Sequence, residues 1–223
     1  MDWDDYWAKA QAGPRKGVYA VIAELYRNQI ISRSAAHLLS RCLPSGPARR
    51  YLHAGCGSGG SDRRLTAAQS RFHCLDLSLR ALALHRQQPL SVECVYVCGN
   101  IFALPYDRDV FDGIFNFGVM EHFSERDIGR ILSEFHRVLK TDGALVLFWP
   151  PDFGLSVLAL KIFLGTINRF RRAPLELHPP EISRIHSFRW VRDLMERHRF
   201  AVVHVEFGWR DLFTQVVVVA QKA

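Results

Sequence analysis

The sequence predicts an α/β fold built on a doubly wound, mostly parallel β-sheet. From residue 50 onward, segments with the pattern of short buried strands alternate with helical segments, which is typical of right-handed βαβ units. The last two strand-like segments are separated by only a few residues around Gly208, too few for a crossover helix, so we expect an antiparallel hairpin there. Of the 223 residues, 48% are hydrophobic and 23% are charged, which agrees with a globular chain and excludes wholesale disorder.

The individual elements follow from the spacing of apolar residues and from helix-capping residues. Residues 1–45 have helical spacing. Ser78 is a typical cap for a helix to about Gln87, and Ser124 is one for a helix through Lys140. The other expected helices run from Gly60 to about Ser70 and from Phe188 to His198. The expected strands cover residues 50–54, 72–77, 92–97, 110–117, 144–149, 200–207 and 213–221.

Charge and cysteine content exclude several classes of protein. Lys and Arg number 29 against 22 Asp and Glu, and this net charge of +7 is ordinary for a soluble domain. The five cysteines include no C-x-x-C pair, so we expect no disulfide framework, no metal site and a cytoplasmic location. The acidic, aromatic start lacks the features of a signal peptide. The longest apolar stretch, residues 153–167, would reach about 22 Å as a helix, too short to span a bilayer.

A glycine-rich turn connects the first expected strand to the helix after it. Gly55, Gly57 and Gly59 leave the main chain bare, so that a ligand can approach backbone N–H groups at the helix start. Asp76 lies at the end of the next strand, where an acidic side chain can accept hydrogen bonds from two ribose hydroxyls. Its alternative role, capping the following helix, is already filled by Ser78. The two features predict a nucleoside-binding cleft at this edge of the sheet.

Five motifs follow one another in order through the centre of the chain. They are Leu-His-Ala-Gly-Cys-Gly-Ser-Gly at residues 52–59, Cys-Leu-Asp-Leu-Ser at 74–78, and residues 99–106, 111–123 and 137–146. In order and spacing they resemble the class I S-adenosylmethionine-dependent methyltransferases, particularly the small-molecule group (type 11) that includes the ubiquinone-biosynthesis type. The resemblance implies a Rossmann-like methyltransferase fold with seven strands in the order 3-2-1-4-5-7-6, strand 7 being antiparallel.

The resemblance also implies S-adenosyl-L-methionine as cofactor and a role for each matching residue. The glycine turn would pass under the methionine portion, and Asp76 would hold the ribose. Leu77, Asn100 and Ile101 would contact the adenine, and the end of the fourth strand would offer a carbonyl oxygen to the amino group. The cofactor-binding residues implied in this way are His53, Gly55, Cys56, Gly57, Gly59, Asp76, Leu77, Asn100, Ile101, Phe117 and Gly118.

Two positions depart from the family pattern. His53 stands where the family usually has Glu or Asp, so the site loses a negative charge that would complement the cationic end of the cofactor. Asn100 replaces the usual Asp but keeps an oxygen acceptor. The departure at His53 leaves a second class of function open, namely a methyltransferase-like protein that is deficient in cofactor binding and has a non-catalytic role.

A nicotinamide-dependent oxidoreductase would use a similar cleft. Gly55, Gly57 and Gly60 satisfy its G-x-G-x-x-G pattern, and an acidic residue follows the next strand. Three features count against this alternative: the antiparallel hairpin, the motif at residues 111–123, and the lack of a recognisable acid for hydride transfer such as Tyr-x-x-x-Lys. The sequence therefore favours methyl transfer to a small acceptor that is hydrophobic or lipid-like.

Candidate catalytic residues follow the fourth strand. Methyl transfer from a sulfonium depends mainly on alignment, and a general base is needed only where the acceptor must lose a proton. Glu121 and His122 lie at the carboxyl edge of the sheet, where ligands bind in such folds, and ordering of the loop is their alternative role. His178 and His186 are further candidates, with loop packing as their alternative.

We expect residues 1–223 to form a single methyltransferase domain, with a helical N-terminal cap at 1–45 and a lid-like insert at 150–186. The insert joins an apolar helix to a cluster of arginines, so it either covers an apolar pocket or contacts a membrane surface through residues 152–172. N-terminal aromatic residues either form a second lid or simply pack. Without an aromatic stripe among the basic residues, we expect a small-molecule substrate and no nucleic acid, and the oligomeric state stays open.

Overall fold

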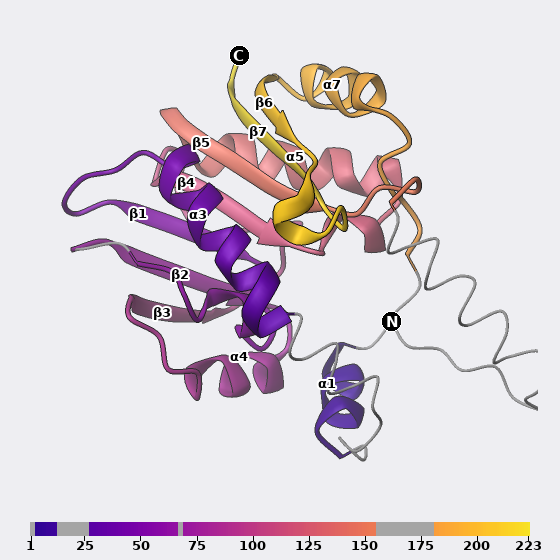
Figure 1. Cartoon of the computed structure of the whole chain (residues 1–223). Helices are drawn as coiled ribbons and strands as arrows, with labels where there is room; N and C mark the ends of the chain where they lie inside the picture. Colours follow the sequence, from indigo (N-terminus) through magenta and orange to yellow (C-terminus); the bar gives the residue numbers. More distant parts are fainter. Residues whose placement is uncertain (1–2, 13–26, 67–68, 155–180) are drawn as a thin grey trace, which may run out of the picture.

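The computed structural model describes residues 3–12, 27–66, 69–154 and 181–223, and it contains one seven-stranded sheet (Figure 1). The strands are β1 (Arg50–Ala54), β2 (Arg71–Asp76), β3 (Glu93–Cys98), β4 (Phe111–Phe117), β5 (Leu139–Trp149), β6 (Phe200–Glu206) and β7 (Val216–Lys222). Their order is β3-β2-β1-β4-β5-β7-β6. The first five strands are parallel to one another, and β7 runs antiparallel to both β5 and β6. The expected strand order and terminal hairpin are confirmed.

Helices cover both faces of this sheet, and Figure 1 shows α3 in front of it and α5 behind. Apolar side chains of α3 and α4 pack on one face, while those of α5 and α7 pack on the other. Each face therefore has its own buried core, as expected for a doubly wound fold. The helices are α1 (Trp3–Ala12), α3 (Ser32–Cys42), α4 (Leu79–Arg86), α5 (Glu125–Val138) and α7 (Phe188–Arg197), with single turns η1 (Arg27–Ile31), η2 (Gly60–Asp62), η3 (Met120–His122) and η4 (Trp209–Asp211).

Serine side chains begin three of these helices. The hydroxyl oxygen of Ser78 accepts a hydrogen bond from the Ala81 amide at the start of α4. Ser124 and Ser187 cap α5 and α7 in the same way. Each cap satisfies an amide that has no partner within the helix. Both serines expected to cap helices do so.

The prediction of a helix from Gly60 to about Ser70 is wrong. In the described part of this segment, residues 60–66 and 69–70, the only helical element is the single 3-10 turn η2, in which the Asp62 amide donates to the Gly59 carbonyl oxygen. Leu65 is the only large apolar side chain between Gly60 and Ser70, which is too little for the apolar stripe of a helix. The Asp62 side chain instead turns into the protein, where two histidines bind it.

The two ends of the expected insert lie beside one another. The Ile185 amide donates a hydrogen bond to the Pro150 carbonyl oxygen at 3.1 Å. The Asp152 amide donates one to the Ile185 carbonyl oxygen, also at 3.1 Å. Residues 155–180, which carry the expected lid helix and His178, lie outside the described residues, as do 13–26 of the N-terminal cap. Among the helices of the described segments, none is both long and apolar enough to cross a membrane.

Candidate functional site

The residues expected to bind the cofactor lie at the carboxyl ends of β1, β2, β3 and β4. These strands are neighbours in the sheet, so the segments that follow them meet at one edge. In open α/β sheets this edge is where ligands bind. The convergence follows from the parallel order of the strands and needs no further assumption about the loops.

The glycine turn after β1 uses left-handed backbone conformations. Gly55, Gly57 and Gly59 have φ angles of 74°, 52° and 71°. A Cβ atom on Gly55 would lie 2.8 Å from Val119, and one on Gly59 would lie 2.7 Å from the His85 ring. Glycine is therefore required at these two positions by both backbone conformation and close packing.

Asp76 holds this turn against the start of α4. One of its carboxylate oxygens accepts a hydrogen bond from the Gly57 amide at 2.8 Å, and the other accepts one from the Ser78 amide at 2.9 Å. Burial raises the pKa of Asp76, and the two amides act in the opposite direction. Each oxygen has a further lone pair for a ligand hydroxyl, so the ribose role is compatible with the observed hydrogen bonds.

The residues expected around the adenine differ in how open they are. Leu77 is 57% exposed, which leaves its side chain free to pack against a planar ring. Ile101 is buried in the core, and the Asn100 side-chain oxygen already accepts a hydrogen bond from the Phe102 amide at 2.9 Å. Near the expected adenine, the Leu77 side chain is therefore open to a ligand, while the Asn100 oxygen would have to accept from the ligand and from the Phe102 amide together.

Helix α1 contacts the segments that follow β1, β2 and β4. The ring of Trp3 lies 5.3 Å from that of His122, Asp4 bonds the Ser78 hydroxyl, and Trp7 packs 3.1 Å from where a Cβ of Gly57 would lie. Figure 1 shows α1 beside α4, separate from the sheet. The N-terminal aromatic residues therefore lie against the expected cofactor site.

The turn after β4 carries a buried carboxylic acid. Phe117 ends this strand, and Gly118 follows with a φ of 63°, where a Cβ would lie 3.0 Å from Oε1 of Glu121. Burial raises the pKa of Glu121 to about 8. Its Oε2 atom is buried without a hydrogen-bond partner among the described residues. A proton-holding group thus lies next to Gly118, one of the residues expected to contact the cofactor.

Comparison with known protein families supports the same interpretation. Residues 52–147 match the family profile described as a methyltransferase domain. This part of the chain is a methyltransferase domain. The class of protein expected from the five motifs is confirmed.

Several named methyltransferases are similar to this domain. The 24-methylenesterol C-methyltransferase 3 of Arabidopsis thaliana is 30% identical over 108 residues, which cover 46% of this chain and 29% of that protein. An uncharacterized methyltransferase of Synechocystis is 29% identical over 159 residues, covering 66% and 70% of the two chains. The chain therefore spans less than a third of the length of the sterol relative.

The methyltransferase fold extends over nearly the whole chain. Magnesium protoporphyrin IX methyltransferase from Synechocystis, solved with bound SAH, superposes with a TM-score of 0.68 and 16% identity. The superposition covers 98% of this chain and 94% of that one. Similarity at this level shows a shared fold.

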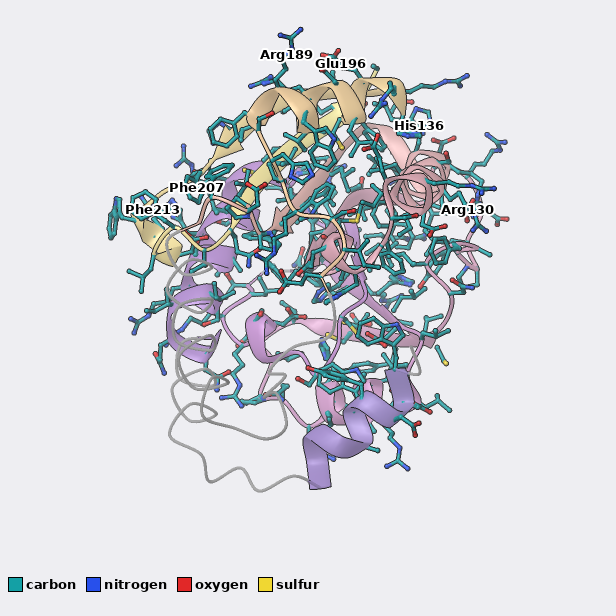
Figure 2. The ribbon with its side chains drawn as sticks, turned by 90° about the vertical axis from the view of Figure 1, so that its right-hand side faces the viewer. Arg130, His136, Arg189, Glu196, Phe207 and Phe213 are labelled. Carbon is teal, nitrogen blue, oxygen red and sulfur yellow. The ribbon has the colours of Figure 1, made fainter. Side chains whose placement is uncertain are left out.

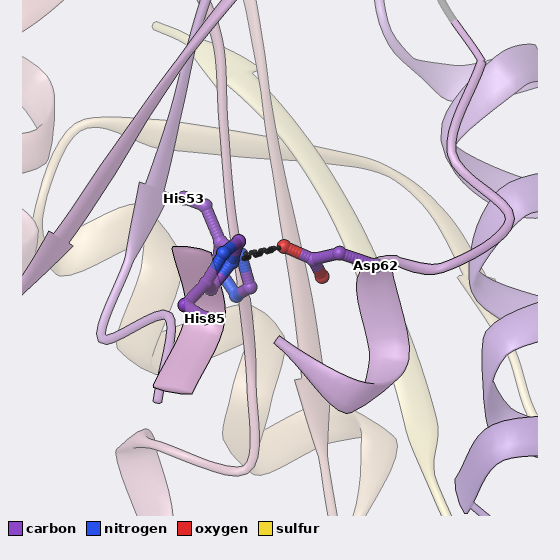
Figure 3. A group of neighbouring side chains, drawn as sticks. All are labelled: His53, Asp62 and His85. Atoms are coloured by element: carbon purple, nitrogen blue, oxygen red, sulfur yellow. Dashed lines mark hydrogen bonds and ion pairs between the residues drawn. The ribbon is translucent and has the colours of Figure 1, made fainter. Parts of the chain in front are cut away.

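A buried cluster beneath the glycine turn joins His53 to two residues that the sequence did not single out, Asp62 and His85. His53 from β1 and His85 from α4 both bind the same oxygen of Asp62, at 2.7 and 2.9 Å (Figure 3). One nitrogen of each histidine and one oxygen of Asp62 lie within 4.8 Å of one another, which is close enough for a shared metal ion. The spacing of histidines and cysteines in the sequence had predicted no metal site. Asp62 and His85 are 9 and 32 residues from His53 along the chain, so no local pattern connects them.

His186, another candidate base, lies at the foot of the insert. Its Nδ1 atom pairs with Asp152 at 2.8 Å, and the His186 side chain is largely exposed. This pair lies beside the hydrogen bonds that join the two ends of the insert. The structure does not bring His186 together with the glycine turn through any contact among the described residues.

Replacing Gly59 with Ala should destabilise the domain. The left-handed backbone and the clash with His85 together should lower the free energy of unfolding by about 1–3 kcal/mol. Gly60→Ala is the matched control, because a Cβ there would lie 3.4 Å from Asn28 and the backbone is not left-handed. Urea denaturation measures both, and an equal loss in the two variants would contradict the packing described for Gly59.

The raised pKa of Glu121 should appear in the pH dependence of stability. The folded protein binds this proton more tightly than the unfolded chain, so the stability contributed by protonated Glu121 is fully present below about pH 4.5 and is lost as pH rises through about 8. Relative to wild type, Glu121→Gln should therefore become more stable as pH rises across this range. Urea denaturation at several pH values measures the difference.

The control for Glu121 is Glu196→Gln, since Glu196 lies on the exposed face of α7 (Figure 2). That variant should keep a constant difference from wild type at every pH. A constant difference for Glu121→Gln as well would mean that Glu121 is ionised in the folded protein at neutral pH.

Proposed function

We propose that this methyltransferase domain transfers a methyl group from S-adenosylmethionine to a small, hydrophobic or lipid-like acceptor. The observation that carries the proposal is the joining of the left-handed glycine turn to Asp76 at the carboxyl edge of the sheet. The relatives include an enzyme named as a sterol C-methyltransferase. A structural neighbour is named as a geranyl diphosphate C-methyltransferase from Streptomyces coelicolor, with a TM-score of 0.60 and 20% identity over 96% of this chain and 88% of that one.

The residues at this edge fit a nucleoside with a cationic end. Asp76 offers unused lone pairs for ribose hydroxyls, and the open side of Leu77 suits an adenine ring. The glycine turn presents bare main chain to the methionine portion. Trp7 covers Gly57 from α1, so the helix would lie over the bound cofactor and exclude water from it.

The protein's main task in such a transfer is alignment. The bound sulfonium supplies an activated methyl group, so an acceptor held in line with it needs little further help. Where the acceptor is an alcohol or phenol, a bond from its oxygen to the methyl carbon would form as the sulfur–methyl bond breaks, and the acceptor would have to lose its proton. In this proposal Glu121 would take that proton, and its buried, unpartnered Oε2 atom supports the assignment. Because only the ionised form accepts a proton, the rate would rise as pH increases through about 8.

A measurement of cofactor binding distinguishes the proposed methyltransferase from a non-catalytic protein and from a nicotinamide-dependent oxidoreductase. Isothermal titration calorimetry should show binding of S-adenosylmethionine and no binding of NADH. Asp76→Ala should weaken binding about 10- to 100-fold, because two hydrogen bonds of roughly 1 kcal/mol each are lost. Asp142→Ala, which removes an exposed acid on β5, should leave the affinity unchanged.

Three outcomes of that titration would overturn parts of the proposal. No heat and no thermal shift at millimolar S-adenosylmethionine would support a non-catalytic protein. Binding of NADH would support the oxidoreductase. Unchanged affinity in Asp76→Ala would show that another residue holds the ribose.

An exposed aromatic patch supports an apolar acceptor or a lipid surface. Phe153 contacts the rings of Phe188 and Phe207, and Phe207 contacts that of Phe213, with centroids 5.4–6.0 Å apart. Figure 2 shows Phe207 and Phe213 at the opposite edge of the molecule from Arg130. This patch, defined by the four phenylalanines, includes the point where the chain enters the insert.

We also propose that residues 152–172 contact membranes peripherally. Replacing Arg169, Arg171 and Arg172 with Ser should reduce co-sedimentation with anionic liposomes several-fold, because each basic residue near such a surface contributes about 1 kcal/mol. Liposomes of neutral lipid should bind both proteins weakly.

The matched control carries the same substitution at three exposed arginines on α5 and α7, namely Arg126, Arg189 and Arg192. Its co-sedimentation should equal that of wild type. Equal pelleting of all three proteins would defeat the idea of membrane contact through the insert.

A further inference from the structure

The cluster beneath the glycine turn joins three separate elements through one carboxylate oxygen. His53 lies on β1, Asp62 in η2 and His85 on α4, and Figure 3 shows both rings approaching the same end of Asp62. The side chains are 2%, 3% and 0% exposed. The acid and both rings are therefore removed from water, where charge interactions are strong and extend further.

Asp62 is a buried anion. Burial by itself would raise its pKa, but the charges and hydrogen bonds of His53 and His85 outweigh that effect and lower it. Both ring nitrogens that face Asp62 lie at hydrogen-bond distance from its Oδ2 atom. The arrangement keeps a negative charge inside the domain at neutral pH.

The opposite side of this cluster has unused hydrogen-bonding capacity. Asp62 Oδ1, His53 Nε2 and His85 Nδ1 are buried without partners among the described residues. The His53 ring is fixed by Asp62, and it also stacks on the ring of Phe115, with the two centroids 4.5 Å apart.

The cluster lies close enough to the cofactor site to act on it electrostatically. Burial raises the pKa of Asp62 and of Asp76, and an electrostatic interaction with His53 opposes that effect at both, so the ring lies within range of both acids. The Cys56 thiol in the glycine turn also lies within range of both acids: burial is the main cause of its raised pKa, Cys74 opposes it, and Asp76 and Asp62 each raise it further. The turn thus lies between two carboxylates, one on the ribose side and one beneath it.

A metal ion accounts for the cluster less well than hydrogen bonds do. Coordination through His53 Nδ1 and His85 Nε2 would move each ring proton to the other nitrogen. No acceptor lies next to either of those atoms among the described residues, so two buried N–H groups would lose their partners. Histidines that bind metals normally donate their second N–H to an acceptor.

We propose that Asp62, acting through His53, supplies the negative charge that attracts the cationic amino-acid end of the cofactor. The proposal rests on the proposed function and concerns the departure at residue 53, where the family resemblance implied an acid. Asp62 is a positioning residue: it fixes the His53 ring and places its own charge behind that ring. The charge missing from β1 is thereby provided by η2, from a residue nine positions later.

The test compares ligands that differ in charge. Asp62→Asn should weaken binding of S-adenosylmethionine at least tenfold and leave binding of 5′-methylthioadenosine, which lacks the amino-acid end, within about twofold of wild type. A purely structural role for Asp62 would weaken both ligands equally. Titration calorimetry gives both affinities, and thermal unfolding checks that the variant is folded.

A second variant moves the acid to the other position. His53→Asp combined with Asp62→Asn should recover most of the affinity for S-adenosylmethionine, and this double variant keeps the test valid where Asp62→Asn alone does not fold. Failure of the double variant to recover affinity would overturn the proposal, as would equal weakening of both ligands by Asp62→Asn.

Measurements on wild type distinguish failure of the charge role of Asp62 from failure of cofactor binding as a whole. If wild type binds neither ligand, the proposed function fails and the role of Asp62 fails with it. If wild type binds S-adenosylmethionine and Asp62→Asn binds it equally well, only the role of Asp62 fails. Metal analysis of purified wild type should show no stoichiometric metal, and one equivalent that is lost in Asp62→Asn would overturn the proposal in favour of a metal site.

Discussion

The candidate site depends on the glycine turn after β1 being held in place by two acids, the half-buried Asp76 and the buried Asp62. A turn with three left-handed glycines has little conformational preference of its own, so its shape must be fixed by contacts with the rest of the fold. Asp76 binds the Gly57 amide from the neighbouring strand. Asp62 holds η2 beneath β1 through His53 and His85, and the His85 ring packs against Gly59. Loss of either acid would release one side of the turn.

This arrangement assigns two different electrostatic tasks to one small region. The acid at the end of β2 keeps lone pairs for neutral hydroxyl groups, which suits a sugar. The acid beneath the turn is enclosed by imidazole rings and acts as a fixed charge, which suits a cation. A nucleoside that carries a cationic amino-acid end has both features. The electrostatics of the turn and the proposed cofactor therefore agree without any charge on β1 itself.

Much of the fold could be predicted from local sequence patterns. The alternation of strands and helices, the serine caps and the short connection near Gly208 each depend on residues close together in the chain, and the structure agrees with them. The glycine turn and Asp76 were predictable for the same reason, because each follows a strand directly. The order of the strands came from resemblance to a family, since spacing alone does not specify which strands become neighbours.

The parts that were missed depend on contacts between distant residues. The segment after Gly60 was expected to be a helix, but it begins with a single 3-10 turn whose Asp62 side chain bonds two buried histidines from other elements. His53 was recognised as a departure, yet its partner could not be identified because η2 reaches β1 only in the folded chain. The burial that raises the pKa of Glu121 likewise comes from tertiary packing rather than from neighbouring residues. Sequence patterns could therefore locate the site but not its electrostatics.

The most direct test of the account is amide NMR of the labelled protein during titration with S-adenosylmethionine. Binding at the carboxyl edge predicts that the largest shifts occur at Gly55, Gly57, Asp76 and Leu77, with little change at Arg189 or Glu196 on α7. Saturable shifts confined to the first group would establish the cleft as the cofactor site. An unchanged Gly57 resonance at saturating cofactor, or shifts located only elsewhere in the molecule, would contradict it.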